Sequence, residues 1–320
     1  MEDVYLSILK KYWGYDGFRG IQREIIESIG NGRDTLGLMP TGGGKSITFQ
    51  VPALSRDGIC IVVTPLIALM KDQVRNLRGR GIKAAAVYSG LSREEILVTL
   101  ENCIFGNYKF LYVSPERLAS DIFLAKVRHM PVSFLTVDEA HCISQWGQDF
   151  RPSYLKILDF LQKLPRRPAL AAFTATATAQ VRSDIVRILQ LQDPVTVVTG
   201  FDRPNLRFEV LRPQDKRRAL LELLEERRDK SGIVYCATRK GVEQICELLQ
   251  SRGFAASRYH AGLSPDERRQ NQEDYICDRC TVMVATNAFG MGIDKSNVSY
   301  VIHCNMPKSV EAYYQEAGRA

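Results

Sequence analysis

A glycine-rich segment that ends in a lysine and a serine is the first stretch whose residue types could carry out chemistry. The run Met39-Pro-Thr-Gly-Gly-Gly-Lys-Ser46 follows the short apolar run Thr35–Leu38. Successive glycines let backbone N–H groups turn toward a polyphosphate, and a helix that starts here would present its positive N-terminal end. Lys45 would then bridge the β- and γ-phosphates, and the Ser46 hydroxyl would bind Mg²⁺. The strict motif begins with glycine where this chain has Met39, and a plain glycine-rich turn is the alternative interpretation.

Two adjacent carboxylates at the end of another apolar run complete a candidate nucleotide site. The run Phe134–Val137 is followed by Asp138-Glu139-Ala-His141. Asp138 could hold the Mg²⁺ ion, and Glu139 could polarise the water that attacks the γ-phosphate. Plain surface charge is the alternative, but the phosphate loop earlier in the chain favours the functional interpretation. The loop residues that would bind the nucleotide are Thr41, Gly42, Gly43, Gly44, Lys45 and Ser46.

Short apolar runs of strand length alternate with amphipathic runs of helix length, a pattern that predicts parallel sheets of the α/β class. The predicted strands of a first series are Thr35–Leu38, Ile59–Val63, Ala85–Tyr88, Phe110–Val113, Phe134–Val137, Leu170–Phe173 and Thr196–Val198. Those of a second series are Gly232–Cys236, Ala255–Tyr259, Thr281–Ala285 and Tyr300–His303. In open α/β sheets, ligands bind beyond the carboxyl ends of the strands, where most of the candidate side chains fall.

Two similar series of strands in tandem predict two related lobes. The segment Gly200-Phe-Asp-Arg-Pro-Asn205 separates them, so we place the domain boundary there. Residues 1–205 would form the first lobe and residues 206–320 the second. Two helix starts are marked by Ser92-Arg-Glu-Glu95 and Ser264-Pro-Asp-Glu267, both with the spacing of a capping box.

Composition is that of an ordinary globular protein and excludes disordered, collagenous and fibrous classes. Of the 320 residues, 45% are hydrophobic and 25% are charged, and 43 Lys and Arg against 36 Asp and Glu give a net charge of +7. This mild, dispersed positive charge permits a polyanionic partner but does not require one. No apolar run approaches the ~18 residues that cross a bilayer, and the acidic start lacks the apolar core of a signal peptide. We therefore expect an intracellular protein without a membrane partner.

The eight cysteines are scattered through apolar segments, which is typical of reduced core thiols in an intracellular chain. Cys277 and Cys280 have a metal-type spacing, but a structural zinc site needs four ligands and the sequence has no second pair of this kind. We therefore expect no zinc in this chain.

The glycine-rich loop and the segment Asp138–His141 together resemble motifs of superfamily 2 helicases, in which Met or Ala commonly replaces the first glycine of the loop. Further segments resemble the RecQ family of DNA helicases. The run Tyr15-Asp-Gly-Phe-Arg19-Gly-Ile-Gln22 is similar to motif 0 of that family. The resemblance implies that Tyr15 and Arg19 sandwich the adenine of ATP and that Gln22 pairs with its N6/N7 edge. Without the phosphate loop, Gln22 would be interpreted as an exposed helix residue.

The segment Cys142–Tyr154 follows directly and resembles the aromatic-rich loop of RecQ enzymes. Trp146 and Phe150 would offer stacking faces to single-stranded DNA, and Arg151 would add a cation. Stacking on aromatic side chains contributes about 1–3 kcal/mol per base. Periodicity alone would make Trp146 and Phe150 core residues, but their glycine and polar neighbours favour a loop.

Other segments that follow predicted strands are similar to the family's nucleic-acid-binding and coupling motifs. Short hydroxyl side chains and helix N-termini suit contacts to phosphates without base readout. The resemblance implies DNA contacts by Thr64, Pro65, Ser114, Thr238, His260 and Thr286, and coupling of the ATP and DNA sites by His141, Thr174, Thr176, Gly292 and Asp294. For His260, a structural role is an equally open alternative.

The run Gln315-Glu-Ala-Gly-Arg319-Ala320 matches the start of the family's motif VI, which implies catalytic roles for Gln315 and Arg319. The second arginine of that motif, which the resemblance implicates as an arginine finger on the γ-phosphate, would fall beyond Ala320. Such a finger is worth about 10³–10⁵ in turnover. We therefore expect a chain cut within the second lobe that binds ATP and DNA but hydrolyses ATP slowly.

These expectations combine into two tandem RecA-like α/β lobes, the second incomplete, with ATP and Mg²⁺ in the cleft between them. The resemblance implies 3′→5′ ATP-dependent DNA unwinding, in DNA repair and recombination, by a monomer that acts on single-stranded and partly duplex DNA. It also implies a cytoplasmic, nucleoid-associated location in a bacterium or a nuclear one in a eukaryote. The alternatives are an RNA helicase or remodeller of the same superfamily, and a clamp that binds ATP and nucleic acid with little turnover.

Overall fold

Parallel strands with helices between them build both halves of the chain. The computed structural model describes residues 3–40, 42–147, 149–175, 177–200, 205–289, 295 and 297–320. The chain divides into two compact units, residues 1–201 and 202–320, each with its own sheet. The predicted α/β class with two lobes is confirmed, while the domain boundary after residue 205 stays a prediction.

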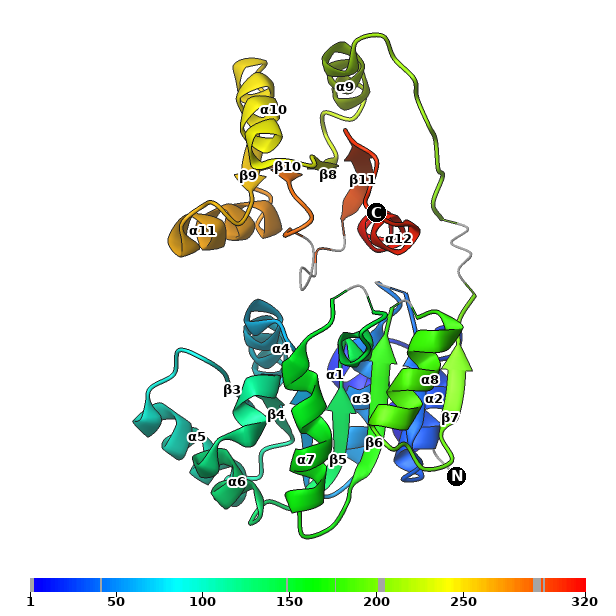
Figure 1. Cartoon of the computed structure of the whole chain (residues 1–320), viewed down its shortest axis with the longest axis vertical. Helices are drawn as coiled ribbons and strands as arrows, with labels where there is room; N and C mark the ends of the chain where they lie inside the picture. The colour runs from blue at the N-terminus through cyan, green and yellow to red at the C-terminus, as the bar shows by residue number, and fades with distance from the viewer. Residues whose placement is uncertain are drawn as a thin grey trace. The chain divides into compact units, whose positions relative to one another are not determined.

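The first unit contains a seven-stranded parallel sheet in the order β3-β4-β2-β5-β6-β1-β7. Its strands are β1 (Thr35–Leu38), β2 (Ile59–Val63), β3 (Ala84–Val87), β4 (Phe110–Val113), β5 (Val132–Val137), β6 (Ala169–Thr174) and β7 (Val195–Val198). All residues of β1, β2 and β4 are buried, because helices cover both faces of the sheet (Figure 1).

Eight helices and three short 3₁₀ turns of the first unit lie within the described residues. The helices are α1 (Val4–Trp13), α2 (Gln22–Gly30), α3 (Lys45–Ser55), α4 (Ile67–Gly79), α5 (Arg93–Phe105), α6 (Asp121–Val127), α7 (Lys156–Lys163) and α8 (Ala179–Ile188). The 3₁₀ turns are η1 (Pro115–Ala119), η2 (Ala140–Ile143) and η3 (Pro152–Leu155). In this unit and the next, no described helix is both long and apolar enough to cross a membrane.

A buried aspartate ties together the amino ends of three strands of this sheet. Asp34, just before β1, accepts hydrogen bonds from the Arg167 guanidinium at 2.6 and 3.2 Å. It also accepts from the Leu170 N–H (2.8 Å) in β6 and from the Gln192 N–H (2.7 Å) shortly before β7. Because a buried carboxylate is costly without partners, these bonds compensate Asp34 for the hydration that it loses inside the protein.

The second unit contains a four-stranded sheet in the order β11-β8-β10-β9, with all pairs parallel. Its strands are β8 (Ser231–Tyr235), β9 (Ala256–Tyr259), β10 (Val282–Ala285) and β11 (Val298–His303), and its helices are α9 (Lys216–Glu225), α10 (Arg239–Ser251), α11 (Pro265–Ile276) and α12 (Val310–Ala317). Figure 1 shows α9 and α10 on one face of the sheet and α11 and α12 on the other. Two hydrophobic clusters, one on each face, form the core.

The predicted elements agree closely with the observed ones, and one capping detail does not. Each predicted strand overlaps an observed strand, with ends that differ by at most two residues. Ser92 and Glu95 form the full capping box of α5, with bonds of 3.2 and 2.7 Å. At α11, Ser264 accepts from the Glu267 N–H (3.2 Å) as predicted. The second bond of a capping box, from the Ser264 backbone to the Glu267 carboxylate, was predicted wrongly. The Glu267 carboxylate instead accepts from Arg258 of β9 (3.0 Å).

Candidate functional site

The glycine-rich loop leads from β1 into α3, and its backbone conformation depends on its glycines. Gly42 and Gly44 have φ angles of 78° and 74°, in the left-handed region that favours glycine. A Cβ on Gly43 would come within 3.0 Å of the Pro40 carbonyl oxygen. Met39, by contrast, is buried in the core beneath α2 and α3, so the first position of the motif serves packing in this chain.

Lys45 is the first residue of α3, and its ammonium lies against the two carboxylates that follow β5. Lys45 Nζ is 3.2 Å from Asp138 Oδ1 and 3.6 Å from Glu139 Oε1, and all three side chains are largely buried. Burial disfavours the charged ammonium, but the two carboxylates outweigh this effect and raise the pKa of Lys45. Burial also raises the pKa of Asp138, against the opposing effect of Lys45. The cluster therefore holds one buried positive charge beside two acidic groups.

A strained backbone turn presents the two carboxylates to one lysine. The Asp138 N–H still donates to the Val63 carbonyl (2.9 Å), which continues the ladder between β5 and β2. Glu139 then turns the chain with φ 48° and ψ 45°, a left-handed conformation that non-glycine residues rarely adopt. Such residues cost of order 1–3 kcal/mol and cluster at functional sites.

The groups at this edge of the sheet fit a nucleoside triphosphate with a divalent cation. The N-terminus of α3, an eleven-residue helix, directs its dipole and unbonded N–H groups toward an anion. Ser46 lies in the first turn, and its hydroxyl and the Asp138 carboxylate are the oxygen ligands that Mg²⁺ prefers. Among the described residues, no group of three or more His, Cys, Asp or Glu side chains could hold a metal.

The residues predicted to hold adenine lie beside the same loop and contact protein groups. Gln22 is 3% exposed, so the exposed-helix alternative is wrong; its Nε2 donates to the Gly43 carbonyl (3.1 Å) and its Oε1 accepts from the Arg19 N–H (2.8 Å). The Arg19 guanidinium lies 5.7 Å from the centre of the Tyr15 ring. A base stacked between two flat groups needs a gap of about 7 Å, twice the van der Waals spacing. Tyr15 and Arg19 must therefore separate to admit adenine.

His141 connects the carboxylates after β5 with the end of β6. Its Nδ1 lies 3.0 Å from the Thr174 hydroxyl and 3.4 Å from Glu139 Oε2. Burial lowers the pKa of His141 despite the opposing effect of Glu139, so the imidazole is neutral at pH 7. The structure thus brings together two of the residues predicted to couple the sites, and their coupling role stays a prediction.

The segment after His141 forms an irregular loop between η2 and η3 that exposes an aromatic side chain. Trp146 is 74% exposed, which excludes the core alternative for this residue. Phe150 is partly buried, and Arg151 donates two hydrogen bonds to Asp149 at 2.6 and 2.8 Å. An exposed indole in the same loop as a partly exposed guanidinium offers groups that can stack on a base.

Two residues that the sequence analysis missed hold this loop in place. Ser144 Oγ donates to Asp184 Oδ2 of α8 (2.7 Å) and accepts from the Trp146 N–H (3.1 Å). Asp184 is buried and also accepts from Arg187 (2.8 Å). The serine and the aspartate are 40 residues apart and belong to no shared motif, so the sequence contains no signal for their contact.

Three residues predicted to contact DNA lie at the ends of β2 and β4. Thr64 is 1% exposed, and its hydroxyl donates to Asp138 Oδ2 across 3.4 Å, which places it next to the phosphate-binding groups. Ser114 Oγ is buried and has no hydrogen-bond partner in the described part of the chain. Pro65 is partly exposed before α4. Both hydroxyl groups are buried, so each would have to become exposed before it could contact DNA. The DNA contacts stay predictions.

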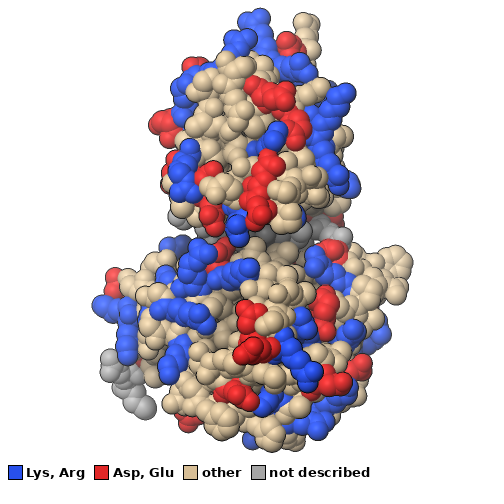
Figure 2. All heavy atoms as spheres, turned by 90° about the vertical axis from the view of Figure 1, so that its left-hand side faces the viewer, with Lys and Arg blue, Asp and Glu red and all other residues tan. Residues whose placement is uncertain are grey.

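Positive side chains gather at the end of the first unit that holds these groups. Figure 1 shows the arrowheads of β5, β6 and β7 at the upper end of this unit. Figure 2, turned about the same vertical axis, shows Lys and Arg concentrated on the upper part of that unit and mixed with Asp and Glu below. A polyanion that approaches the carboxyl ends of the strands would therefore meet favourable charge.

In the second unit, the predicted DNA contacts differ in their exposure. Thr238 is exposed at the N-cap of α10, where its Oγ1 accepts from the Gly241 N–H (3.0 Å). Thr286 is partly exposed after β10. His260 is 4% exposed; its Nε2 lies 2.6 Å from Glu243 Oε1, and its Nδ1 accepts from the Gly262 N–H (3.1 Å). With both ring nitrogens bonded, the geometry of His260 favours the structural alternative.

The remaining predicted site residues are in or near α12, or lie outside the described residues. Gln315 and Arg319 are both partly exposed. The charge of Arg319 affects the pKa of the Tyr235 phenol. Burial raises the pKa of Tyr235 to about 12, and the Arg319 guanidinium opposes this rise. The catalytic roles of Gln315 and Arg319 stay predictions. The predicted residues that lie outside the described residues are Thr41, Thr176, Gly292 and Asp294.

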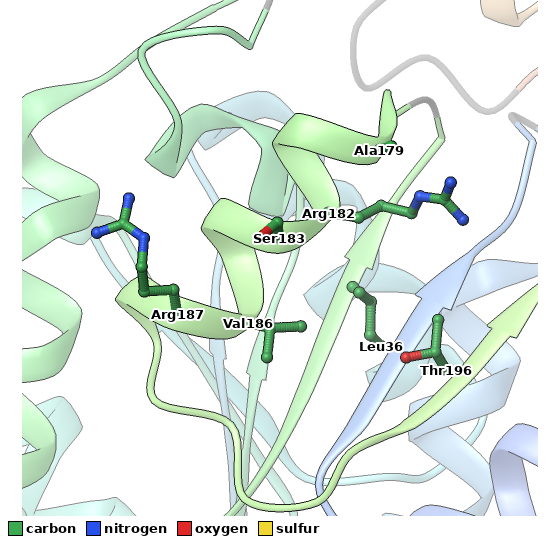
Figure 3. Close-up of a pocket in the computed structure, with 7 residues that line it drawn as sticks. All are labelled: Leu36, Ala179, Arg182, Ser183, Val186, Arg187 and Thr196. Atoms are coloured by element: carbon green, nitrogen blue, oxygen red, sulfur yellow. The ribbon is translucent and has the colours of Figure 1, made fainter.

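A surface hollow of about 430 Å³ in the first unit contains none of the predicted site residues. Figure 3 shows Arg182 and Val186 on α8 above it, with Leu36 of β1 and Thr196 of β7 beside them. The hollow is open to solvent, and none of the residues predicted to bind ATP or DNA lines it, so we assign it no catalytic role.

Comparison with known families agrees with this combination of a phosphate loop, adjacent carboxylates and two parallel sheets. Residues 19–185 match the DEAD/DEAH box helicase family, and residues 215–320 match the helicase conserved C-terminal domain. The chain also superimposes on the Mycobacterium smegmatis helicase Lhr bound to ssDNA and AMP-PNP, with a TM-score of 0.77, 21% identity and coverage of 98% of this chain and 46% of that one. The two family matches place the chain in the class of DEAD/DEAH box helicases, and the superposition shows that it shares their two-lobed fold.

Sequence relatives narrow the class to one family. The chain is 48% identical to the ATP-dependent DNA helicase RecQ of Bacillus subtilis, over 98% of this chain and 53% of the relative. It is 41% identical to the RecQ helicase of Synechocystis, over 98% of this chain and 67% of the relative. The chain therefore belongs to the RecQ family of DEAD/DEAH box helicases. It spans about half the length of the first curated relatives that it matches.

Proposed function

We propose that this chain is an ATP-driven DNA helicase motor core that moves 3′→5′ along single-stranded DNA. The observation that carries the proposal is the cluster at the start of α3, where Lys45 Nζ lies 3.2 Å from Asp138 and 3.6 Å from Glu139 beside a loop of left-handed glycines. A lysine held by two acidic groups next to backbone N–H donors is suited to the γ-phosphate of ATP.

Each residue of the cluster has a separate role in this proposal. Lys45 leaves the carboxylates and contacts the β- and γ-phosphates when ATP binds. Ser46 and Asp138 would hold Mg²⁺, which when bound would supply positive charge to the phosphates. Glu139 positions the attacking water, and Gln315 and Arg319 of the second unit contribute to the same reaction. Adenine is held by a rearrangement of nearby residues, in which Tyr15 and Arg19 separate and Gln22 exchanges the Gly43 carbonyl for the base edge.

The coupling between ATP and DNA is proposed to run through residues that already touch. His141 contacts both Glu139 and Thr174, so a change at the γ-phosphate can reach the end of β6. The loop that carries Trp146 begins three residues after His141 and is held to α8 through Ser144. Thr238, at an exposed helix start in the second unit, grips the phosphate backbone. The 3′→5′ direction rests on the resemblance to the RecQ family.

The relatives named as DNA helicases favour DNA over RNA as the substrate, since phosphate contacts alone do not distinguish the two sugars. The RNA helicase or remodeller and the slow ATP-binding clamp remain as competing proposals. Stimulation of ATP hydrolysis by RNA as strongly as by DNA would favour the first, and nucleotide binding without turnover would favour the second.

ATP hydrolysis with and without a single-stranded oligonucleotide tests the proposal. We expect Mg²⁺-dependent turnover that DNA stimulates and that Glu139→Gln abolishes, because an amide cannot polarise the water. Glu101→Gln is the matched control, since Glu101 is an exposed carboxylate paired with Lys126 on the surface. Turnover that survives Glu139→Gln, or that DNA does not change, would overturn the proposed mechanism. A fluorescent ATP analogue then shows whether an inactive variant still binds nucleotide.

A further inference from the structure

Two cysteines occupy neighbouring positions just beyond the ends of β8 and β11. These strands are parallel and pair His303 with Tyr235, so the next pair along the ladder is Cys304 with Cys236. The Cys304 N–H donates to the Tyr235 carbonyl (2.9 Å), which keeps the two backbones paired at this point. Adjacent strands lie about 4.8 Å apart, within the range of Cα separations that a disulfide bridges.

Both thiols point to the same face of the sheet. The rings of Tyr235 and His303 stack at 5.4 Å, so the following pair of side chains lies on the opposite face. Cys236 belongs to the hydrophobic cluster under α9 and α10, and Cys304 packs against the same cluster. The placement of the two strands therefore brings both sulfur atoms together on the side covered by these helices.

The two thiols differ in reactivity. Cys236 is 6% exposed, whereas Cys304 is partly exposed. A hydrogen bond from the Cys236 thiol lowers the pKa of Cys304, burial opposes this effect, and the positive charge of Lys216 adds to it. The same hydrogen bond and burial raise the pKa of Cys236. Reactive thiols are accessible and have a lowered pKa, so Cys304 is the attacking group and Cys236 the second partner.

We propose that Cys236 and Cys304 form a reactive dithiol that hydrogen peroxide oxidises to an intrachain disulfide. The Cys304 thiolate attacks one peroxide oxygen, the O–O bond breaks, and the other oxygen leaves as water after protonation. The Cys304 sulfur then carries a hydroxyl as a sulfenic acid. The Cys236 sulfur attacks it, the S–O bond breaks, and the thiol proton leaves with the hydroxyl as a second water. Two electrons pass from the sulfur atoms to the peroxide, and a thiol reductant restores the pair.

The bridge would lie next to a proposed DNA contact. The Ala237 N–H donates to Asn305 Oδ1 (3.2 Å), and Thr238 follows as the cap of α10. A disulfide would restrict the backbone of both segments that the hydrogen bond between Ala237 and Asn305 joins. This expectation rests on the proposed function. Oxidation should reduce the DNA-stimulated part of ATP hydrolysis at least twofold, without changing the basal rate.

Mass spectrometry of the oxidised chain tests the bridge independently of any activity. The whole chain is treated with hydrogen peroxide, free thiols are alkylated, and the protein is digested with trypsin. Cleavage after Lys230, Arg239, Lys295 and Lys308 yields peptides 231–239 and 296–308, each with one of the two cysteines and no other. We expect these peptides joined, lighter than their sum by two hydrogens, and separated by reductant. A bridge between Cys277 and Cys280, or Cys304 oxidised further without a bridge, would overturn the proposal.

Two variants separate the bridge from its effect on activity. Cys304→Ser should prevent the cross-linked peptides and make DNA-stimulated hydrolysis insensitive to peroxide. Cys277→Ser, which removes an exposed thiol at the end of α11, should leave both unchanged. Cross-linked peptides with no change in hydrolysis would establish the dithiol and refute its link to Thr238. A chain without DNA-stimulated turnover refutes the proposed function, while the peptide measurement still decides the dithiol.

Discussion

The two units differ in how deeply the polar side chains at the carboxyl ends of their strands are buried. In the first unit, Lys45, Asp138 and His141 are largely buried and contact one another or a shared neighbour. In the second unit, Thr238 is an exposed helix cap and Thr286 is partly exposed, while His260 is a buried exception. Buried charges interact strongly because water is excluded, which suits phosphate chemistry. Exposed helix starts bind a phosphate backbone weakly and reversibly, which suits movement along a strand. Under the proposed function, the same type of sheet would serve catalysis in the first unit and phosphate contacts in the second.

One ion pair from each unit shows a similar contrast in burial. Asp34 of the first unit is buried and accepts from Arg167 and from two backbone N–H groups. The pair between Arg218 and Glu222 in the second unit lies on the surface of α9, with both side chains more than half exposed. Removing a buried carboxylate leaves its donors unpaired in a water-poor site, so it should destabilise the fold far more than removing one partner of a surface pair.

The largest expected effect is on stability. Asp34→Ala should lower the free energy of unfolding by about 3–5 kcal/mol, because it leaves the Arg167 guanidinium and two N–H groups unpaired at the amino ends of three strands. Urea unfolding followed by circular dichroism measures this loss. Glu222→Ala is the comparison in the second unit and should cost less than about 1 kcal/mol. Equal losses would show that the buried anchor is not special.

The next effect is on catalysis. Lys45→Ala should reduce ATP hydrolysis by about 10²–10³-fold, because the γ-phosphate loses a positively charged donor in a water-poor site. Initial rates at saturating ATP measure this loss. Lys163→Ala, which removes an exposed lysine in the last turn of α7, is the control and should retain the full rate. A Lys45→Ala variant with near-normal turnover would remove this cluster from the mechanism.

A smaller effect is expected on DNA binding. Trp146→Ala should weaken affinity for a single-stranded oligonucleotide by about 1–3 kcal/mol, the contribution of one stacked base. Fluorescence anisotropy of a labelled oligonucleotide gives the dissociation constant. Phe105→Ala removes another exposed aromatic side chain, at the end of α5, and should leave the affinity unchanged. If the two variants bind equally well, the loop does not stack on DNA.

The smallest effect is a pH dependence of stability. The folded protein lowers the pKa of His141 below its ordinary value of 6.5, mainly through burial. Below about pH 6.5 the unfolded chain therefore binds more protons than the folded protein. The free energy of unfolding should decrease as the pH is lowered, by at most about 1.4 kcal/mol per pH unit. Unfolding free energies at pH 7.5 and 5.5, compared with His141→Gln, measure this contribution. His129→Gln, at an exposed position, should keep the wild-type slope, and a His141→Gln variant with that slope would refute the prediction.

Much of the fold was predictable because strands and helices leave local patterns. Buried parallel strands appear as continuous apolar runs, and all eleven predicted strands overlap observed ones within the described residues. The capping box at Ser92 was predictable for the same reason, since both partners lie within one helical turn. The return bond at Ser264 was not, because Arg258 comes from a neighbouring strand and competes for the Glu267 carboxylate.

The candidate site divides along the same line. Lys45, Asp138 and Glu139 were recognisable because each belongs to a short motif at the end of an apolar run. The contact between Ser144 and Asp184 was not, since it depends on how α8 packs beside the loop. The 5.7 Å separation between Arg19 and Tyr15 likewise depends on side-chain conformation.

The amino-acid sequence alone determined the class of fold, the phosphate loop and the family, because these depend on residues close together in the chain. Only the tertiary structure decided that Thr64 bonds to Asp138, that Gln22 is held by the loop and that Cys236 lies opposite Cys304. These contacts follow from the order of strands in each sheet and from competition among partners for the same donor or acceptor. The local spacing of residues predicts neither the strand order nor this competition, because parallel strands that are neighbours in space are separated in sequence by whole helices.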